Sequence, residues 1–122
     1  MNKDETDNKI EIIASLKQGW NGKDAPAMPH ELIEKVRWIV EQLDIQPELF
    51  PTAMQTIQFE YDNARQDHME IEVGSADTAE VFLACHNGAE SYEKLLVDPN
   101  SFRERMHAFM NNPVPIQVAK SE

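Results

Sequence analysis

The sequence predicts an α+β fold in which helices cover one face of an antiparallel sheet. Two segments with the apolar spacing of helices come first, segments with alternating polarity occupy the middle, and one more helical segment follows. A sheet with a single apolar face must bury it against another layer, and here only the helices can supply that layer. We therefore expect two N-terminal helices, an antiparallel meander of three to four strands, and a C-terminal helix on the apolar face of the sheet.

The two N-terminal helices are predicted from the spacing of their apolar residues. Ile10, Ile13 and Leu16 recur at three-residue steps, as they do on one face of a short helix. Residues 1–7 are mostly polar, and we expect them to be frayed. The second helix has the i, i+4, i+7, i+8, i+11 spacing of a buried stripe, formed by Leu32, Val36, Ile39, Val40 and Leu43.

The middle of the chain changes from helical spacing to strict alternation. Residues 57–61 and 69–73 place apolar side chains at every second position, which is typical of strands with one buried face. Residues 80–86 read as a third strand that is apolar on both sides. Residues 89–97 fit either a fourth strand or irregular chain.

The last helix is predicted after residue 98. Asp98 directly precedes a proline and is a suitable N-cap, and Phe102, Met106 and Phe109 follow at helical spacing. Residues 113–122 are expected to form a tail. The length of 122 residues is enough for one domain with its own core, so we expect residues 1–122 to form a single domain.

Composition narrows the classes of function. The formal net charge is −11, and without a basic patch such a chain repels nucleic acid, so a nucleic-acid partner is not expected. No apolar run approaches the ~20 residues of a membrane span, and no signal peptide is recognisable. The single cysteine, Cys85, forms no internal disulfide, which favours the cytoplasm. The acidic charge favours either a basic protein partner or a role in solubility alone.

The loop between the two N-terminal helices contains a tryptophan among turn-forming residues. Gly19 is suited to end the first helix, and Asn21 and Gly22 tolerate the positive φ of a sharp reversal. Burial of an aromatic side chain contributes roughly 2–3 kcal/mol. We expect Trp20 to pack into the core as an anchor that fixes the approach of the two helices, and ligand stacking is the functional alternative.

The loop and the first two strands resemble a group of small, poorly characterised bacterial proteins. The group shares a Gly-Trp-Asp/Asn-Gly motif, a helix, Pro-Thr, an I-x-x-E-W-like strand and an L-E-I-E-V strand. The matching positions are Gly19, Trp20, Asn21, Gly22, Ala25, Pro26, Pro51, Thr52, Ile57, Glu60, Tyr61, Glu70, Ile71, Glu72 and Val73. They span roughly half of the chain, from residue 16 to residue 73. The resemblance implies a bacterial origin and this fold outline, and it implies no activity.

Three positions depart from the pattern of that group. Gln55 and Thr56 stand where a Gly-Gly is expected, Tyr61 stands where a tryptophan is expected, and Lys23 replaces an aromatic residue.

Matching the apolar faces of the three predicted strands sets their register. This matching pairs Phe59 with Ile71 and Ile71 with Leu83. A slip by two residues would preserve both faces but change every cross-strand neighbour.

In this register one row on the polar face consists of Asp62, His68 and His86. Directly opposed Cβ atoms lie ~5 Å apart, so these three side chains are candidates for a metal site or for a histidine base oriented by an acid. The alternative is that this polar face is solvated and binds no ligand. The face opposite an apolar core is normally solvated, and histidine and aspartate are common there. We therefore expect no cofactor and no resident metal.

The same face carries a carboxylate-rich area that we expect to contact a partner. Glu60 lies opposite Glu70, an unfavourable pair of like charges, with Glu72 and Phe82 in the neighbouring row. Apolar residues surrounded by charge are typical of contact surfaces, including those of homodimers. We expect a non-enzymatic protein that acts through protein–protein contacts, possibly neutralising a basic partner as antitoxins and immunity proteins do. The alternative is a metal-dependent or acid–base enzyme that uses the Asp62, His68 and His86 row.

Overall fold

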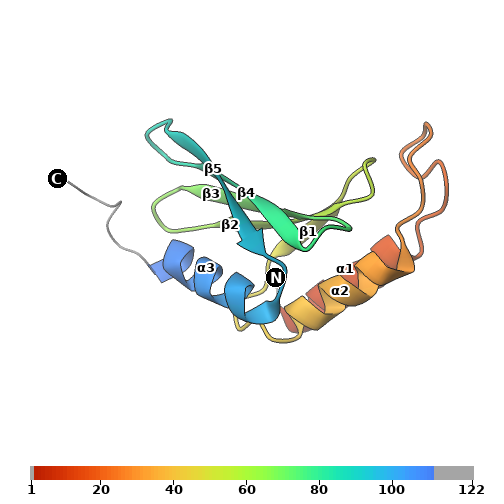
Figure 1. Cartoon of the computed structure of the whole chain (residues 1–122), viewed down its shortest axis with the longest axis horizontal. Helices are drawn as coiled ribbons and strands as arrows, with labels where there is room; N and C mark the ends of the chain where they lie inside the picture. Colours follow the sequence, from red (N-terminus) through yellow and green to blue (C-terminus); the bar gives the residue numbers. More distant parts are fainter. Residues whose placement is uncertain (1, 112–122) are drawn as a thin grey trace.

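The computed structural model describes residues 2–111, and it contains three helices and one five-stranded antiparallel sheet. The elements in chain order are α1 (Lys3–Ala14), α2 (His30–Val40), β1 (Glu48–Pro51), β2 (Ile57–Asp62), β3 (His68–Val73), β4 (Thr78–Ala84), β5 (Glu90–Leu96) and α3 (Pro99–Asn111). The sheet order is β1-β2-β3-β4-β5, so each strand pairs with its neighbour in sequence. The three helices lie on one side of the sheet (Figure 1), which confirms the predicted α+β class.

One continuous hydrophobic core lies between the sheet and the helices. Every second residue of β2 and β3 is buried, as their alternation predicts. The ring of Phe59 on β2 meets Phe102 of α3 edge to face, with ring centroids 5.3 Å apart. The residues that contribute most to this core and are under 2% exposed include Phe59, Phe102, Ile10, Ile13, Ile39, Leu49, Ile57, Met69, Ile71, Met106, Val36 and Val40.

Helix α1 begins earlier than the sequence analysis predicted. Residues 3–7, expected to be frayed, form its first turns because Asn2 and Glu5 make a capping box. The side chain of Asn2 accepts from the Glu5 backbone N–H at 2.8 Å, and the Glu5 carboxylate accepts from the Asn2 N–H at 2.9 Å. Thr6 is also buried, so the segment has a tertiary contact to hold it. The predicted tail, residues 113–122, lies outside the described residues.

The sheet contains two strands that the sequence analysis missed or left open. Residues 48–51 form β1, which pairs with β2 at one edge, and Leu49 is fully buried there. Pro51 is tolerated because an edge strand needs no second ladder of N–H donors. Residues 90–96 form β5, so the alternative of a further strand in this segment is the correct one.

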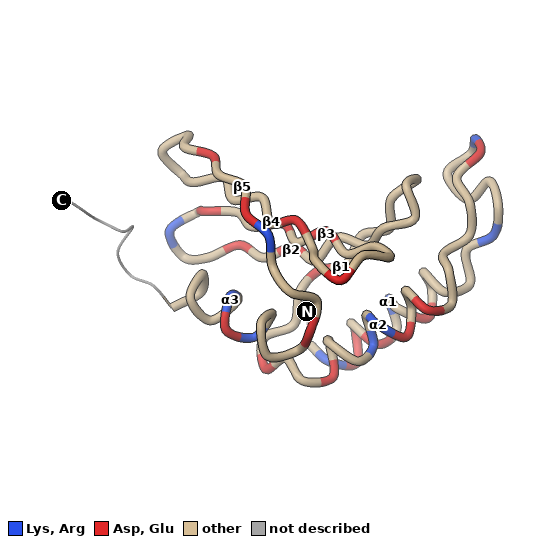
Figure 2. The backbone as a smooth tube through the Cα atoms, viewed as in Figure 1, with Lys and Arg blue, Asp and Glu red and all other residues tan. Residues whose placement is uncertain are grey.

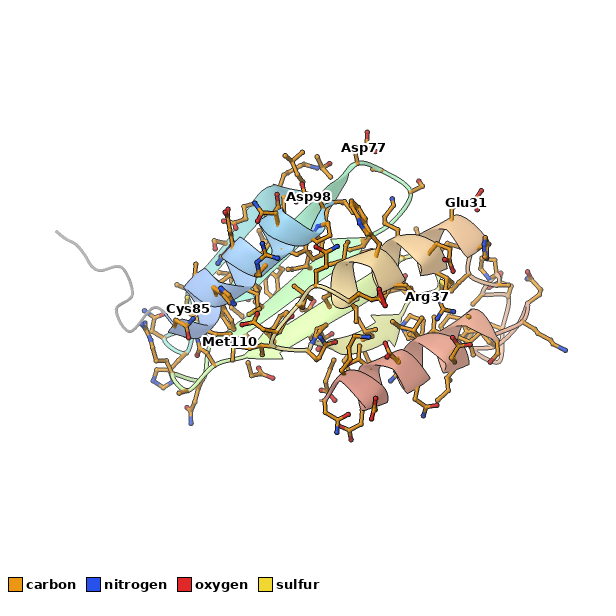
Figure 3. All side chains as sticks on the ribbon, turned by 90° about the horizontal axis from the view of Figure 1, so that it is seen from below. Glu31, Arg37, Asp77, Cys85, Asp98 and Met110 are labelled. Atoms are coloured by element: carbon orange, nitrogen blue, oxygen red, sulfur yellow. The ribbon has the colours of Figure 1, made fainter. Side chains whose placement is uncertain are left out.

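Helix α3 returns beneath the sheet after β5. Asp98 caps it as predicted, since its two carboxylate oxygens accept from the backbone N–H and the hydroxyl of Ser101 at 2.7 and 3.1 Å. The buried stripe of α3 contains Phe102, Met106 and Phe109. Seen from the helix side, α3 lies across the sheet, with Asp98 near one end and Met110 near the other (Figure 3).

Candidate functional site

The side of the sheet that faces away from the helices is the candidate functional surface, and we call it the outer face. It consists of the alternate strand residues whose side chains point away from the core. Seven of them are acidic, namely Glu48, Glu60, Asp62, Glu70, Glu72, Glu80 and Glu90. The strands carry acidic positions along their length (Figure 2). Lys94 and His68 are the outer-face residues able to carry positive charge, so this part of the described chain is strongly anionic.

One histidine lies at the centre of the acidic residues on β2 and β3. Nδ1 of His68 lies 2.8 Å from Oδ1 of Asp62, which is its direct cross-strand partner. Nε2 lies 3.0 Å from Oε2 of Glu70 and 3.6 Å from Oε1 of Glu60. We call these four residues, Glu60, Asp62, His68 and Glu70, the His68 cluster. Its imidazole therefore has a carboxylate on each side.

The hairpin between β2 and β3 fixes the positions of these side chains. The cross-strand pairs Glu60–Glu70 and Asp62–His68 match the predicted register, which is confirmed for these two strands. The side-chain oxygen of Asn63 accepts from the backbone N–H groups of Arg65 and Asp67, both at 3.0 Å. This Asx-type loop closes the hairpin and holds the ends of both strands in register.

The carboxylate of Glu60 is destabilised by its surroundings. Partial burial raises its pKa, and repulsion from Glu70 raises it further, while His68 acts in the opposite direction. Asp62 and Glu48 add smaller repulsive contributions. The ionised Glu60 is therefore the most electrostatically unfavourable group of the His68 cluster.

His68 experiences two opposing effects. Partial burial lowers its pKa, but hydrogen bonds to Asp62 and Glu70 and the charges of Asp62 and Glu60 raise it. The net effect is a raised pKa, so the surrounding carboxylates favour the imidazolium form. The cluster can hold a proton on His68, exchange it, or accept another cation in its place.

The predicted row of Asp62, His68 and His86 is not formed. The structure pairs His68 with Ala84 and Glu70 with Phe82, so the predicted register of β3 with β4 is wrong by two residues. His86 lies in the turn after β4, is exposed, and donates its backbone N–H to the Asp67 carboxylate at 2.9 Å.

This error has a simple physical cause. The predicted third strand began at Glu80, whereas β4 begins at Thr78 and buries Ala79 in the core. A small residue gives a weak apolar signal, so the buried position at Ala79 was overlooked. Because the side-chain period of a strand is two, the shifted register keeps the same faces.

An aromatic pair on the outer face was only partly anticipated. Phe82 faces the outer side as expected, but its partner is Tyr92 of β5, with ring centroids 5.1 Å apart. Tyr92 is 73% exposed, which is unusual for so large a side chain. The two rings form one side of a shallow groove of about 290 Å³, whose other lining residues are Gln58, Glu70, Glu72, Glu80 and Val81.

Interactions with polar neighbours hold two of the groove carboxylates. Oε2 of Glu72 accepts a hydrogen bond from the hydroxyl of Thr56 at 2.7 Å. Glu80 forms an exposed ion pair with Lys94 at 3.1 Å. The groove therefore presents oriented acceptors beside an aromatic surface. Residues 90–96 do not alternate in polarity, so the sequence carried no clear signal that would place Tyr92 there.

The loop with Trp20 has an ordered internal structure. Trp20 is half-buried, packs against the core and donates its indole N–H to the carbonyl of Pro26 at 2.9 Å. Gly19 and Gly22 have φ values of +84° and +83°, which favour glycine. Asn21 accepts from the backbone N–H groups of Lys23 and Ala25. These contacts support an anchoring role for Trp20, Asn21 and Gly22, which stays a prediction.

A larger hollow lies on the helix side of the molecule. Its volume is about 620 Å³, and it lies beside the start of α2 and the loops that follow β1 and β3. Lys35 closes one side of it by donating to the backbone carbonyls of Gly74 and Ala76 at 2.8 and 3.3 Å. Since its lysine is already engaged and no cluster of charged groups converges on it, this hollow offers less chemistry than the outer face.

Comparison with known proteins identifies no relative. No protein-family model matches the chain, and no curated protein and no solved structure gives a significant match. The resemblance to small bacterial proteins therefore stays a prediction and carries no argument below. Among the described helices, none combines the length and the apolar character needed to cross a lipid bilayer.

Proposed function

We propose that this protein is a non-enzymatic binding protein whose outer face contacts and neutralises a basic protein partner. The observation that supports this proposal most strongly is that seven carboxylates share the face that the helices leave uncovered, and that three of them, Glu70, Glu72 and Glu80, line one groove with Phe82 and the exposed Tyr92. We place this activity in the cytoplasm, where the single free cysteine would remain reduced.

Electrostatics favours a partner with clustered lysine or arginine side chains. The carboxylates of Glu60 and Glu70 repel one another across the β2–β3 ladder. A positively charged side chain placed between them would relieve this repulsion. The wider field of the face would also accelerate the encounter with such a partner and make it sensitive to salt.

The aromatic pair favours arginine at the centre of the contact. A guanidinium group can stack on an aromatic ring and at the same time form bidentate hydrogen bonds with a carboxylate. Tyr92 provides the ring, and Glu70, Glu72 and Glu80 line the same groove. Tyrosine is also among the residues that contribute most to interface affinity.

The experiment compares two charge-reversal variants with the same net charge. One carries Glu70→Lys and Glu72→Lys on the outer face, and its control, called the α2 variant, carries Glu31→Lys in α2 and Glu41→Lys at the C-cap of α2. Binding of a fluorescent arginine-rich peptide is measured by anisotropy at low and high salt, alongside binding partners recovered from a cell lysate. We expect the outer-face variant to lose binding and the α2 variant to retain most of it.

Three results would contradict the proposal. Equal loss in both variants would show that net charge alone attracts the peptide. Binding that does not weaken as salt rises would exclude an electrostatic contact. A Tyr92→Ala variant that binds the peptide as tightly as the unmodified protein would remove the aromatic pair from the interface.

The enzyme alternative is weakened by the observed register. It required Asp62, His68 and His86 to converge, and only Asp62 and His68 do so. Nε2 of His68, the nitrogen that would act as the base, is already within hydrogen-bonding distance of Glu70. The remaining pair lies on an open face, so the contact function is the one we propose.

A further inference from the structure

We propose that Nε2 of His68 and the carboxylates of Glu60 and Glu70 form a binding site for a divalent transition-metal ion of the zinc type. This inference goes beyond the proposed contact function, because it concerns a ligand that the isolated protein would bind without any partner. It rests on the donor set and geometry of three side chains from two adjacent strands.

The three side chains offer one nitrogen and two oxygen donors. Each provides one ligand atom, and these three atoms all lie within 4.8 Å of one another. An imidazole with two carboxylates is a ligand set suited to zinc, manganese or iron, whereas calcium and magnesium prefer oxygen ligands alone. The histidine therefore selects the class of metal.

The measured separations correspond to the edges of a metal coordination polyhedron. Ligand bonds of about 2.1 Å place neighbouring donors roughly 3.0 Å apart in octahedral geometry and roughly 3.4 Å apart in tetrahedral geometry. Nε2 of His68 lies 3.0 Å from the Glu70 carboxylate and 3.6 Å from that of Glu60. Binding of one ion by all three donors requires the carboxylates of Glu60 and Glu70 to turn toward a common centre beside Nε2 of His68.

Asp62 orients the histidine for this role. Its carboxylate lies 2.8 Å from Nδ1 of His68 and accepts the Nδ1–H hydrogen bond. A metal would therefore bind at Nε2, replacing the present hydrogen-bond contact of Nε2 with Glu70, in the arrangement that carboxylates often impose on metal-binding histidines. When an ion binds, any hydrogen on Nε2 leaves to solvent and the Nε2 lone pair forms the bond to the metal.

The charge of the cluster also fits a divalent cation. Three carboxylates surround one imidazole, so the group carries a net charge of −2 even with a charged histidine. The ion pairs formed by Glu60 and Glu70 within residues 2–111 are both with His68. The three proposed ligands are 29%, 21% and 31% exposed for His68, Glu60 and Glu70, so an ion would be partly shielded and still reachable from solvent.

A second histidine–acid pair provides an internal control. Nε2 of His107 lies 2.7 and 2.9 Å from the two carboxylate oxygens of Asp44, so this pair offers one acid where the His68 cluster offers three. If any exposed histidine beside an acid were sufficient, the two sites would bind metal equally. The proposal requires them to differ.

The experiment titrates Zn²⁺ into tag-free protein that has been treated with a chelator. Isothermal calorimetry gives the stoichiometry and affinity, and ¹⁵N spectra of the imidazoles identify which histidine responds. We expect one ion per chain, with the resonances of His68 shifting first. His68→Gln should weaken binding more than about tenfold, as should Glu60→Gln combined with Glu70→Gln, and Asp62→Ala should weaken it about 10- to 100-fold.

The matched controls are His107→Gln and His86→Gln, which should bind as the unmodified protein does. Circular dichroism verifies that each variant is folded. Undetectable binding, an unchanged affinity in His68→Gln, or loss of the site in His107→Gln or His86→Gln would each overturn the proposal. Peptide binding measured with chelator present tests the contact function separately, so either proposal can fail without the other.

Discussion

The two faces of the sheet are formed by the same strands, but they depend on different features of the sequence. On the inner face Phe59, Met69 and Ile71 are fully buried beneath the helices, and any apolar side chain of similar size would satisfy the same requirement. On the outer face Glu60 and Glu70 are only partly buried and remain reachable from solvent. Their properties depend on which side chains lie directly opposite.

This difference determines which substitutions each face tolerates. The inner face depends on the polarity pattern alone, because burial is the dominant favourable term in folding. The outer face depends on register, since a two-residue slip leaves the polarity pattern intact and replaces every cross-strand pair. We therefore expect substitutions on the inner face to change stability and substitutions on the outer face to change binding.

The largest expected effect on stability comes from removing a large buried side chain from the inner face. Phe59→Ala removes a fully buried ring that packs edge to face on Phe102, and it should lower the free energy of unfolding by about 3–5 kcal/mol. The matched change on the outer face is Phe82→Ala, which should cost no more than about 1 kcal/mol. Urea denaturation of both variants measures the difference, and equal losses would contradict the distinction between the faces.

The next effect concerns a buried acid that connects the β2–β3 turn to the β4–β5 turn at the same end of the sheet. Asp67 is 8% exposed, and its carboxylate accepts from the backbone N–H of His86 at 2.9 Å and from the amide of Asn63 at 3.3 Å. Asp67→Ala should reduce stability by roughly 1.5–3 kcal/mol because charged hydrogen bonds are lost in a buried setting. Asp62→Ala, at an exposed acid on the same hairpin, is the control and should cost less in the same denaturation assay.

Most of the fold could be predicted because burial has a clear sequence period. The stripe of α2 and the alternation of β2 and β3 depend on large apolar side chains, which dominate the free energy of burial. Strand β1 was missed because Pro47 and Pro51 obscure a segment with only one fully buried side chain, Leu49. The start of α1 was missed although Asn2 and Glu5 have the spacing of a capping box.

Only the part of the candidate site that lies on β2 and β3 could be predicted from the sequence. The β2–β3 pairing followed from two strong alternating patterns, so Asp62, His68, Glu60 and Glu70 were correctly placed as neighbours. The predicted β3–β4 pairing was wrong because the correct register depends on the burial of Ala79. The small side chain of Ala79 gives a weak apolar signal, so a register shifted by two residues also matched the apolar faces. The polarity pattern of a strand is therefore not enough to predict its register when one of its buried positions holds a small side chain.

A smaller change in stability is expected when the pH is varied, and it arises from His68 on the outer face. The carboxylates raise the pKa of His68 above its ordinary value of 6.5, despite the opposing effect of burial. The native state therefore binds the proton more tightly than the unfolded state does. The stabilisation is complete below the unfolded pKa of about 6.5 and is lost as pH rises through the higher native pKa.

The measurement is urea denaturation of the chelator-treated protein and of His68→Gln between pH 5.5 and 9. The difference in unfolding free energy between the two proteins should decrease as pH rises. Since Glu60 and the other carboxyl groups are present in both, subtracting the two profiles isolates most of the histidine contribution. A difference that is constant across this range, or that grows with pH, would contradict a raised pKa at His68.

The smallest expected effect is also the one that best distinguishes repulsion from attraction on the outer face. Burial and the charge of Glu70 raise the pKa of Glu60 more than His68 lowers it, so the ionised form of Glu60 is disfavoured in the folded protein. Glu60→Gln should therefore increase stability at pH 7 by a few tenths of a kcal/mol. Glu48→Gln, the exposed cross-strand neighbour of Glu60, should change stability less. A clear loss of stability in Glu60→Gln would mean that the acids stabilise the sheet through His68, and the outer face would then be a structural network with no repulsion for a cation to relieve.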